Sequence, residues 1–466
     1  MTDASYARAE AGSPVLEALQ ELLGDRITTS MAVREQHGRG EDYFKPVPSD
    51  AVCFPETTEE VAEIVKICAA HHTPIIPFGT GTSLEGHVTA PHGGVTIDMS
   101  KMNAILEVNA EDLDCRVQAG VTRKQLNEYL RDTGLFFPID PGADASLGGM
   151  TATRASGTNA VRYGTMKENV LGLTVVTADG RIVKTGGRAK KSAAGYDLTR
   201  LFVGSEGTLG VITEVQLRLY GIPEKIASAV CQYPSLEDAV NSVILTIQSG
   251  IPVARIELLD ALMMEWTIDY ADLEGYEVKP TLFYEFHGTE AGVEEQTELV
   301  RGIADEFGGS TFQWTTSLEE RNKLWQARHD AYYACIARAP GKQGLSTDVC
   351  VPISRLAECL LATAQDTRAS GFEVPIASHA GDGNFHCIFL LDPDDPEELK
   401  RVKECNERLI QRAIALGGTC TGEHGVGAGK MDFLVAEHGE AVSLMRTLKN
   451  AFDPDNIMNP GKIVRM

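Results

Sequence analysis

Pro77-Phe78-Gly79-Thr80-Gly81-Thr82 contains the end of a predicted strand at residues 73–78 and the start of the glycine-rich loop that follows it in this 466-residue chain. Before that strand we predict a short strand at 51–55 and a helix that begins after Thr57. Thr57 and Glu60 have the spacing of a capping box, and apolar residues then recur on one helical face. These elements form a β-α-β unit that ends in a loop of small residues.

The loop differs from a nicotinamide-binding loop in two respects. Its spacing is not Gly-x-Gly-x-x-Gly, and Pro91, Gly93 and Gly94 leave no room for a crossover helix before the strand at 95–99. The pyrophosphate would rest on the N-terminus of that helix. Successive small residues still expose backbone N–H groups, which can form a nest for a phosphate. The alternative is an ordinary glycine turn.

Three further loops of small residues follow in the N-terminal half. They lie at residues 141–150, 155–164 and 204–212. Because glycine disfavours regular structure entropically, four such loops indicate a backbone that approaches an extended, flat ligand at several points. A flavin dinucleotide has these dimensions.

A pair of histidines marks the C-terminal half. His379 and His386 flank Gly381-Asp382-Gly383-Asn384. We predict strands at 372–380 and 384–391, which form a hairpin and bring the two imidazoles near each other. The alternative is a pair of packed, structural histidines.

The segment Thr421-Gly422-Glu423-His424-Gly425 adds a carboxylate and a third imidazole. It follows a predicted helix that begins after Asp395 and ends before Gly417. Two imidazoles and a carboxylate suit a divalent transition metal, and three protein ligands leave positions open for a substrate. Cys387 and Cys420 lie nearby in sequence and are interpreted as packing residues.

Composition excludes several classes of partner. The chain has 42 basic and 66 acidic residues, and its net charge of -24 repels nucleic acid and anionic lipid headgroups. No apolar run approaches about 18 residues, and Met1 to Ala11 have neither a basic n-region nor an apolar h-region. We therefore expect a cytoplasmic protein that meets a membrane only through its electron acceptor. Ten cysteines without a Cys-x-x-Cys pair favour reduced, buried thiols.

Taken together, the motifs resemble the vanillyl-alcohol-oxidase, or PCMH-type, flavoprotein superfamily. Four motifs of this chain resemble the FAD domain of that superfamily: P-F-G-T-G-T at 77–82, P-G-A-D-A-S at 141–146, A-S-G-T-N-A-V-R-Y-G-T at 155–165 and G-S-E-G-T-L-G at 204–210. Three further motifs resemble its FAD-linked oxidase C-terminal region: H-A-G-D-G-N-F-H at 379–386, G-E-H-G at 422–425 and M-N-P-G-K-I at 458–463. Within this superfamily the chain is most similar to the FAD-linked D-2-hydroxyacid dehydrogenases.

The resemblance implies an α+β fold in four parts. These are an N-terminal helical segment at 1–44, a two-subdomain FAD-binding domain at 45–224, a substrate and metal cap at 225–430, and a C-terminal segment at 431–466 that returns to the FAD domain. Strands and helices that alternate between residues 226 and 314 also predict a ferredoxin-like cap.

The resemblance further implies FAD bound without a covalent link. The pyrophosphate would contact Pro77, Gly79, Thr80, Gly81, Thr82, Pro141, Gly142 and Ser146. The flavin and its ribityl chain would contact Gly149, Thr153, Gly157, Asn159 and Tyr163. The adenine end would contact Glu206, Gly207 and Ile212, and Asn459 would return to the isoalloxazine.

The chemistry implied by the resemblance is oxidation of a 2-hydroxy acid. His379, His386 and Glu423 would bind zinc or manganese, and a 2-hydroxy acid would chelate this metal. His424 would remove the hydroxyl proton while the C2 hydride passes to flavin N5. Arg328, on a predicted helix, would clamp the substrate carboxylate, and its alternative is a solvated arginine.

Two positions favour a short substrate. Relatives that oxidise D-2-hydroxyglutarate carry a lysine two residues before Asp348 and an asparagine two residues after the second histidine, where this chain has Ser346 and Ile388. An apolar Ile388 would leave a second carboxylate unpaired, at about 1–3 kcal/mol or more. D-lactate therefore fits best, with D-2-hydroxyglutarate and glycolate as alternatives.

Other expectations concern partners and competing classes of protein. The electron acceptor would be a cytochrome c, a quinone or an electron-transfer flavoprotein, and a homodimer is the default assembly. Lys430 and Lys462 are interpreted as surface charges. A non-haem iron oxygenase could use the same two histidines and Glu423, but it leaves the glycine loops unexplained. A ligand-binding or assembly protein is the third class.

Overall fold

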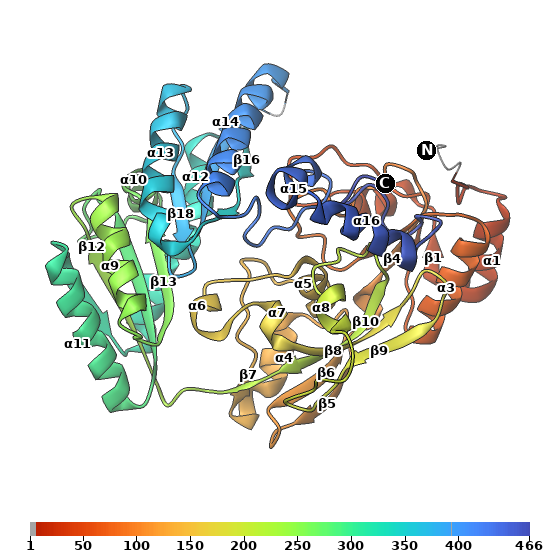
Figure 1. The fold of residues 1–466 in the computed structure, drawn as a ribbon, viewed down its shortest axis with the longest axis horizontal. Coiled ribbons are helices and arrows are strands. Elements are labelled where there is room, and N and C mark those ends of the chain that lie inside the picture. The colour runs from red at the N-terminus through yellow and green to blue at the C-terminus, as the bar shows by residue number, and fades with distance from the viewer. Residues whose placement is uncertain (1–5, 393) are drawn as a thin grey trace. The chain divides into compact units, whose positions relative to one another are not determined.

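The computed structural model describes residues 6–392 and 394–466, which belong to two compact units (Figure 1). The first unit comprises Met1–Ser156, Gly164–Ile222 and Glu423–Met466. The second comprises Gly157–Tyr163 and Pro223–Gly422. The structure thus ends the cap at Gly422 rather than at residue 430, and it adds to the cap a short segment expected in the FAD domain. Residues 1–5 of the predicted N-terminal segment lie outside the described part.

The first sheet of the first unit contains the β-α-β element that precedes the glycine loop. β2 (Ala51–Cys53), β4 (Val95–Asp98) and β3 (Ile75–Phe78) are parallel neighbours in that order. α3 (Thr58–Ala70) connects β2 to β3, and the Thr57 side chain accepts a hydrogen bond from the Glu60 amide. The capped helix between two strands is therefore confirmed.

Both ends of the chain join this sheet. β1 (Ile27–Thr28) pairs antiparallel with β2, and it lies between α1 (Pro14–Leu23) and α2 (Met31–His37). At the other edge, the Asn459 amide donates to the Ile75 carbonyl of β3 at 2.8 Å. The predicted return of the C-terminal segment to the first domain is confirmed.

The second sheet of this unit is antiparallel and completes the two-subdomain arrangement. Its order is β5 (Ile105–Asn109), β6 (Asp114–Gln118), β10 (Val211–Arg218), β8 (Val170–Val176) and β9 (Ile182–Gly186). One face packs on α4 (Arg123–Leu130) and α5 (Leu147–Thr153), whose Leu126, Leu130 and Met150 are buried in the core. The remaining elements of the unit are β7 (Leu135–Phe136), α7 (Met166–Asn169), α8 (Leu198–Phe202), β11 (Tyr220–Gly221), α15 (Met431–His438) and α16 (Ala441–Phe452).

The second unit begins with a ferredoxin-like β-α-β-β-α-β run. In chain order it consists of β12 (Lys225–Gln232), α9 (Leu236–Gln248), β13 (Val253–Leu259), β14 (Thr281–Gly288), α11 (Glu290–Glu306) and β15 (Ser310–Thr315), with α10 (Ala261–Ala271) between β13 and β14. The strands lie in the order β15-β12-β14-β13. The predicted ferredoxin-like cap is confirmed.

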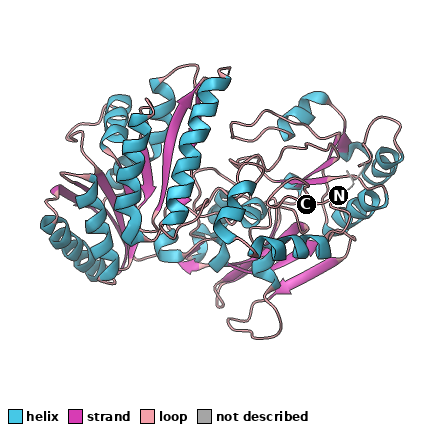
Figure 2. Cartoon of the chain, turned by 45° about the horizontal axis from the view of Figure 1, so that its top comes forward, coloured by secondary structure: helices cyan, strands magenta, loops and turns pink. Residues whose placement is uncertain are grey.

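Three more strands widen this sheet beyond β13. They are β18 (Ile376–His379), β19 (Asn384–Leu391) and β16 (Gln343–Ser346), and β17 (Val349–Cys350) pairs with β19. Figure 2 shows the strands of this unit in magenta with helices packed along them. The other helices are α6 (Ala160–Tyr163), α12 (Leu318–Arg338), α13 (Leu356–Ala369) and α14 (Pro396–Ala415).

The two faces of the cap sheet differ in polarity, because side chains alternate along each strand. On β14, Tyr284 points toward the side of α9 and its hydroxyl meets that of Tyr233 at 3.0 Å. Its neighbour Phe283 points the opposite way and contacts Trp325 of α12. The α12 side, which we call the polar face, carries Arg255, Glu257, Glu285, His287, His379 and His386.

Two lysines interpreted as surface charges are buried, so that prediction was wrong. Lys430 and Lys462 are each 2% exposed. The Lys430 ammonium lies 3.1 Å from the Glu85 carboxylate, and Lys462 Nζ donates to the Thr89 carbonyl at 2.9 Å. Burial lowers the pKa of Lys462 to about 8. These partners are distant in sequence, and local sequence pattern therefore gives no sign of the burial.

Among the described residues, no helix is long and apolar enough to span a bilayer.

A buried ion pair fastens the C-terminal segment to the first unit. Lys449 of α16 pairs with Asp453, and its Nζ also donates to the Thr208 and Met458 carbonyls at 2.8 Å each. Asp453 in turn accepts the Met458 amide at 2.8 Å. Loss of either charged group would leave the other charge buried without its partner.

We predict that Lys449→Met lowers the free energy of unfolding by about 3–5 kcal/mol, because Asp453 would remain buried and uncompensated. Urea unfolding followed by circular dichroism measures this change. Asp432→Asn is the control, since it removes an exposed ion pair with Arg465; we expect less than about 1 kcal/mol. Equal effects of the two variants would contradict the prediction.

Candidate active site

A hairpin on the polar face holds two imidazoles side by side. β18 and β19 pair antiparallel, with His379 opposite Asn384 and Ala377 opposite His386. The ring centroids of the two histidines lie 5.4 Å apart, and their candidate ligand nitrogens lie within 4.8 Å of each other. Both side chains are buried. The predicted hairpin is confirmed.

The hairpin turn is held tightly against the strand that follows α12 and β16. Gly383 has a φ of 80°, and a Cβ there would lie 2.1 Å from the Val351 carbonyl oxygen, which excludes any side chain. Asn384 Nδ2 donates to Asp348 at 2.8 Å and to the Val349 carbonyl at 2.7 Å. Gly383 and Asn384 therefore both contact residues 348–351.

Both histidines have their Nδ1 atoms engaged by acceptors. His386 Nδ1 lies 2.9 Å from the Thr347 carbonyl oxygen, and His379 Nδ1 lies 2.7 Å from a Glu257 carboxylate oxygen. Because these oxygens only accept, the hydrogen-bond network assigns the proton to Nδ1 in each ring. A neutral ring in this tautomer has its lone pair on Nε2, on the edge of the ring opposite this hydrogen bond, where a metal can bind.

Glu257 joins His379 to Arg328. This carboxylate is fully buried; Arg328 Nε donates to its Oε2 at 3.0 Å, and Arg328 Nη2 lies 2.8 Å from the same oxygen as an ion pair. Burial alone would raise the pKa of Glu257, but His379 and Arg328 hold it below its usual value. Arg328 is thus not a solvated helix arginine, since its side chain is only 16% exposed. Sequence reasoning missed Glu257, although an acid inside the apolar strand β13 was a usable signal.

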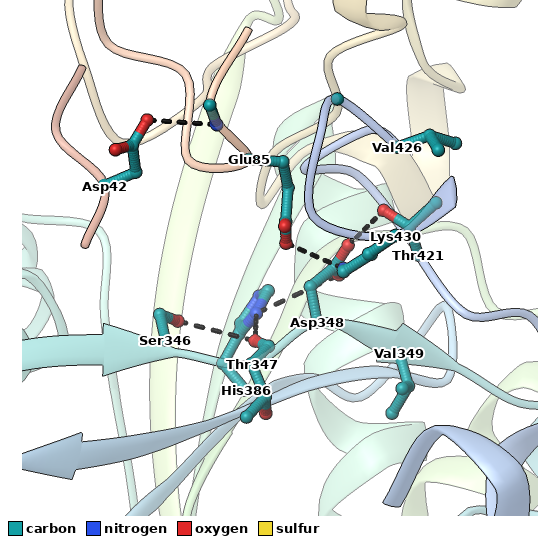
Figure 3. Close-up of polar contacts among 12 residues, drawn as sticks. Asp42, Glu85, Ser346, Thr347, Asp348, Val349, His386, Thr421, Val426 and Lys430 are labelled. Atoms are coloured by element: carbon teal, nitrogen blue, oxygen red, sulfur yellow. Dashed lines mark hydrogen bonds and ion pairs between the residues drawn. The ribbon is translucent and has the colours of Figure 1, made fainter. Parts of the chain in front are cut away.

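Asp348 connects the hairpin with the segment before Glu423. Thr421 donates to Asp348 at 2.6 Å, and His386 Nδ1 lies 4.0 Å from the same carboxylate (Figure 3). A Cβ on Gly422 would lie 2.2 Å from the Asn384 amide nitrogen, so the chain passes against the hairpin at this point. Glu423 follows immediately, with its Cα about 3.8 Å from that of Gly422.

In the first unit, a buried carboxylate binds the loop that follows His424. Glu206 accepts the Val426 amide at 2.7 Å and the Gly427 amide at 2.8 Å. Its other neighbour is His87, whose Nε2 lies 3.2 Å away. Although burial opposes ionisation, His87 and the two amides hold the pKa of Glu206 below its usual value. The side chain predicted to approach adenine therefore binds this loop.

Three of the four glycine loops converge at the end of β3. A Cβ on Gly79 would lie 2.4 Å from Ser146 Oγ, and a Cβ on Gly207 would lie 2.9 Å from the Pro77 ring. Ser146 Oγ accepts the Gly149 amide at 3.4 Å and begins α5. Glycine permits these close contacts with the Ser146 hydroxyl and the Pro77 ring, and the resulting cradle of small residues fits a dinucleotide pyrophosphate.

The fourth loop packs within the second unit. Asn159 Oδ1 accepts a hydrogen bond from Arg255 Nε at 3.0 Å, and the Tyr163 hydroxyl lies 2.8 Å from His287 Nδ1. These side chains face β13 and β14, so their predicted contact with the ribityl chain stays a prediction. The FAD contacts that the resemblance implies for other residues also stay predictions. These residues are Thr80, Gly81, Thr82, Pro141, Gly142, Thr153, Gly157, Ile212 and Asn459.

Most of the cysteines lie in the interior of the protein. Nine of the ten are buried, and Cys350 is partly buried. Burial raises the pKa of Cys387 to about 12, which keeps the thiol protonated. The interpretation of Cys387 as a packing residue agrees with this environment.

Comparison with known proteins places the chain in a family. Residues 48–186 match the FAD binding domain, and residues 222–463 match the C-terminal domain of FAD linked oxidases. A probable mitochondrial D-lactate dehydrogenase of Danio rerio is 52% identical, over 99% of this chain and 93% of the relative. A mitochondrial cytochrome-type D-lactate dehydrogenase of Arabidopsis thaliana is 47% identical, over 97% of this chain and 80% of the relative.

A solved structure shows the same fold. A p-cresol methylhydroxylase superposes with a TM-score of 0.79 at 19% identity and covers 96% of each chain. The predicted PCMH-type architecture is therefore confirmed. With the family matches and the two relatives, it shows that this chain belongs to the FAD-linked oxidases.

Proposed function

We propose that this protein oxidises D-lactate to pyruvate, with FAD and a divalent metal, zinc or manganese, as cofactors. The observation that carries the proposal is the histidine pair on the polar face, in which acceptors hold both Nδ1 atoms and the candidate ligand atoms lie within 4.8 Å of each other. The D-lactate dehydrogenase names of the two relatives support the substrate.

Each candidate residue has a defined part in this proposal. Bound FAD would supply an acceptor for the hydride from C2, and a bound divalent metal would make the substrate hydroxyl more acidic. His379, His386 and Glu423 would hold the metal in a set that leaves positions for the substrate. His424 would take the hydroxyl proton. Arg328 already has an ionic partner in Glu257, so a clamp on the substrate carboxylate would be an additional role.

The side chains of Ser346 on β16 and Ile388 on β19, which we call the wall, favour a short substrate. Ser346 and Ile388, the two positions that carry polar groups in D-2-hydroxyglutarate dehydrogenases, are direct cross-strand partners in β16 and β19. Ile388 is 5% exposed and packs in a hydrophobic cluster with Trp325 and Leu259. A second carboxylate placed there would lose its hydration without gaining a partner.

The competing proposals fare less well. A non-haem iron oxygenase does not account for the FAD-binding match, and glycolate or D-2-hydroxyglutarate stay alternatives within the same chemistry. A cytochrome is the proposed electron acceptor, since one relative is of the cytochrome type. Both relatives carry mitochondrial names, so the expected cytoplasmic location stays a prediction. The expected homodimer also stays a prediction.

We predict that His424→Ala retains FAD and metal but reduces its flavin at least about 100-fold more slowly, because the general base is gone. Anaerobic stopped-flow absorbance with D-lactate measures the rate, and elemental analysis measures the metal. Glu423→Ala is the matched variant, and it should lose metal while staying yellow. Loss of metal in the His424 variant instead would show that base and ligand are exchanged.

The substrate assignment predicts the effect of a double substitution. Ser346→Lys with Ile388→Asn should shift the ratio of kcat/KM for D-2-hydroxyglutarate over D-lactate by on the order of 10- to 100-fold, since the new groups can pair with a distal carboxylate. Steady-state assays with both acids give the ratio. Leu390→Asn, a partly buried position further along β19, is the control. An unchanged ratio in the double variant would argue against this wall as the determinant.

A further inference from the structure

The polar face carries two similar triads of charged side chains. In one, Glu257 lies between His379 and Arg328, at 2.7 Å and 2.8 Å. In the other, Glu285 lies 2.8 Å from His287 and 3.6 Å from Arg255. Both carboxylates are buried and come from neighbouring strands, but only the first triad includes a candidate metal ligand.

We infer that Glu257 is a positioning residue for the metal centre. Its carboxylate accepts the Nδ1 proton of His379, which fixes the ring orientation and directs Nε2 to the ion. A negatively charged acceptor also makes the imidazole a stronger donor to a metal than a neutral acceptor does. The inference rests on the proposed function, because it requires that His379 bind a metal.

Arg328 makes this arrangement stable without a metal. A buried carboxylate needs compensation, and the guanidinium supplies a positive charge and a hydrogen bond from Nε. Together Glu257 and Arg328 are electrically neutral, so the pair can persist inside the cap. Glu257, the only acidic residue of β13, thus connects Arg328 of α12 to His379 of the hairpin. All three residues belong to the second unit.

Comparison with His386 supports the assignment. The Nδ1 of that ring is held by the Thr347 backbone carbonyl, an acceptor that no side-chain substitution removes. His379 instead depends on a side chain for its orientation. Substitution of Glu257 should therefore weaken one ligand and leave the other in place.

The test is the metal affinity of the FAD-loaded protein after removal of bound metal. Glu257→Gln keeps the size of the side chain and removes its charge, and we expect zinc and manganese to bind about 10- to 100-fold more weakly in equilibrium dialysis. FAD content should equal that of the unmodified protein. Glu285→Gln, in the triad without a candidate ligand, should bind both metals with unchanged affinity.

A second variant protects the test against misfolding. Glu257→Gln with Arg328→Met removes both charges, so that neither is left buried alone, and circular dichroism checks its fold. It should show the same weakened binding. Unchanged affinity in both Glu257 variants would overturn the inference while the proposed function stands. If the unmodified protein binds neither metal, the proposed metal centre fails and the inference fails with it.

Discussion

The alternation of side chains across one β-sheet is the constraint on which the candidate site depends. Residues of β14 that point toward α9 build an apolar core, while their neighbours point to the side of α12. The α12 side also packs a hydrophobic cluster that includes Phe283, Trp325 and Leu259, and beside this cluster it presents the ionisable groups. A shift of β13 or β19 by a single residue would exchange these faces and bury the wrong set.

Buried charges on the polar face persist because each has a partner from another element. Glu257 on β13 meets Arg328 on α12 and His379 on β18, and Asp348 meets Thr421 and Asn384. The first unit follows the same rule, since Glu206 is compensated by His87 and two backbone amides. Such networks hold ligands rigidly, and rigid ligands give a metal centre its geometry.

Features with a local cause were predictable from the sequence. Thr57 and Pro396 begin helices, strands and helices alternate from β12 to β15, and the Gly-Asp-Gly turn forms the hairpin. The resemblance of the motifs to a known superfamily predicts the fold. Features that depend on distant partners were not predictable: the burial of Lys430 and Lys462, the pairing of Arg328 with Glu257, and the transfer of residues 157–163 to the second unit.

The central claim is that a metal held by the hairpin histidines enables D-lactate to reduce the flavin. The direct measurement is anaerobic bleaching of the flavin absorption before metal removal, after it, and after zinc or manganese is restored. We predict fast bleaching by D-lactate and none by L-lactate, loss of at least about 100-fold in rate without metal, and recovery when it returns. A colourless protein, or equally fast bleaching without metal, would contradict this account.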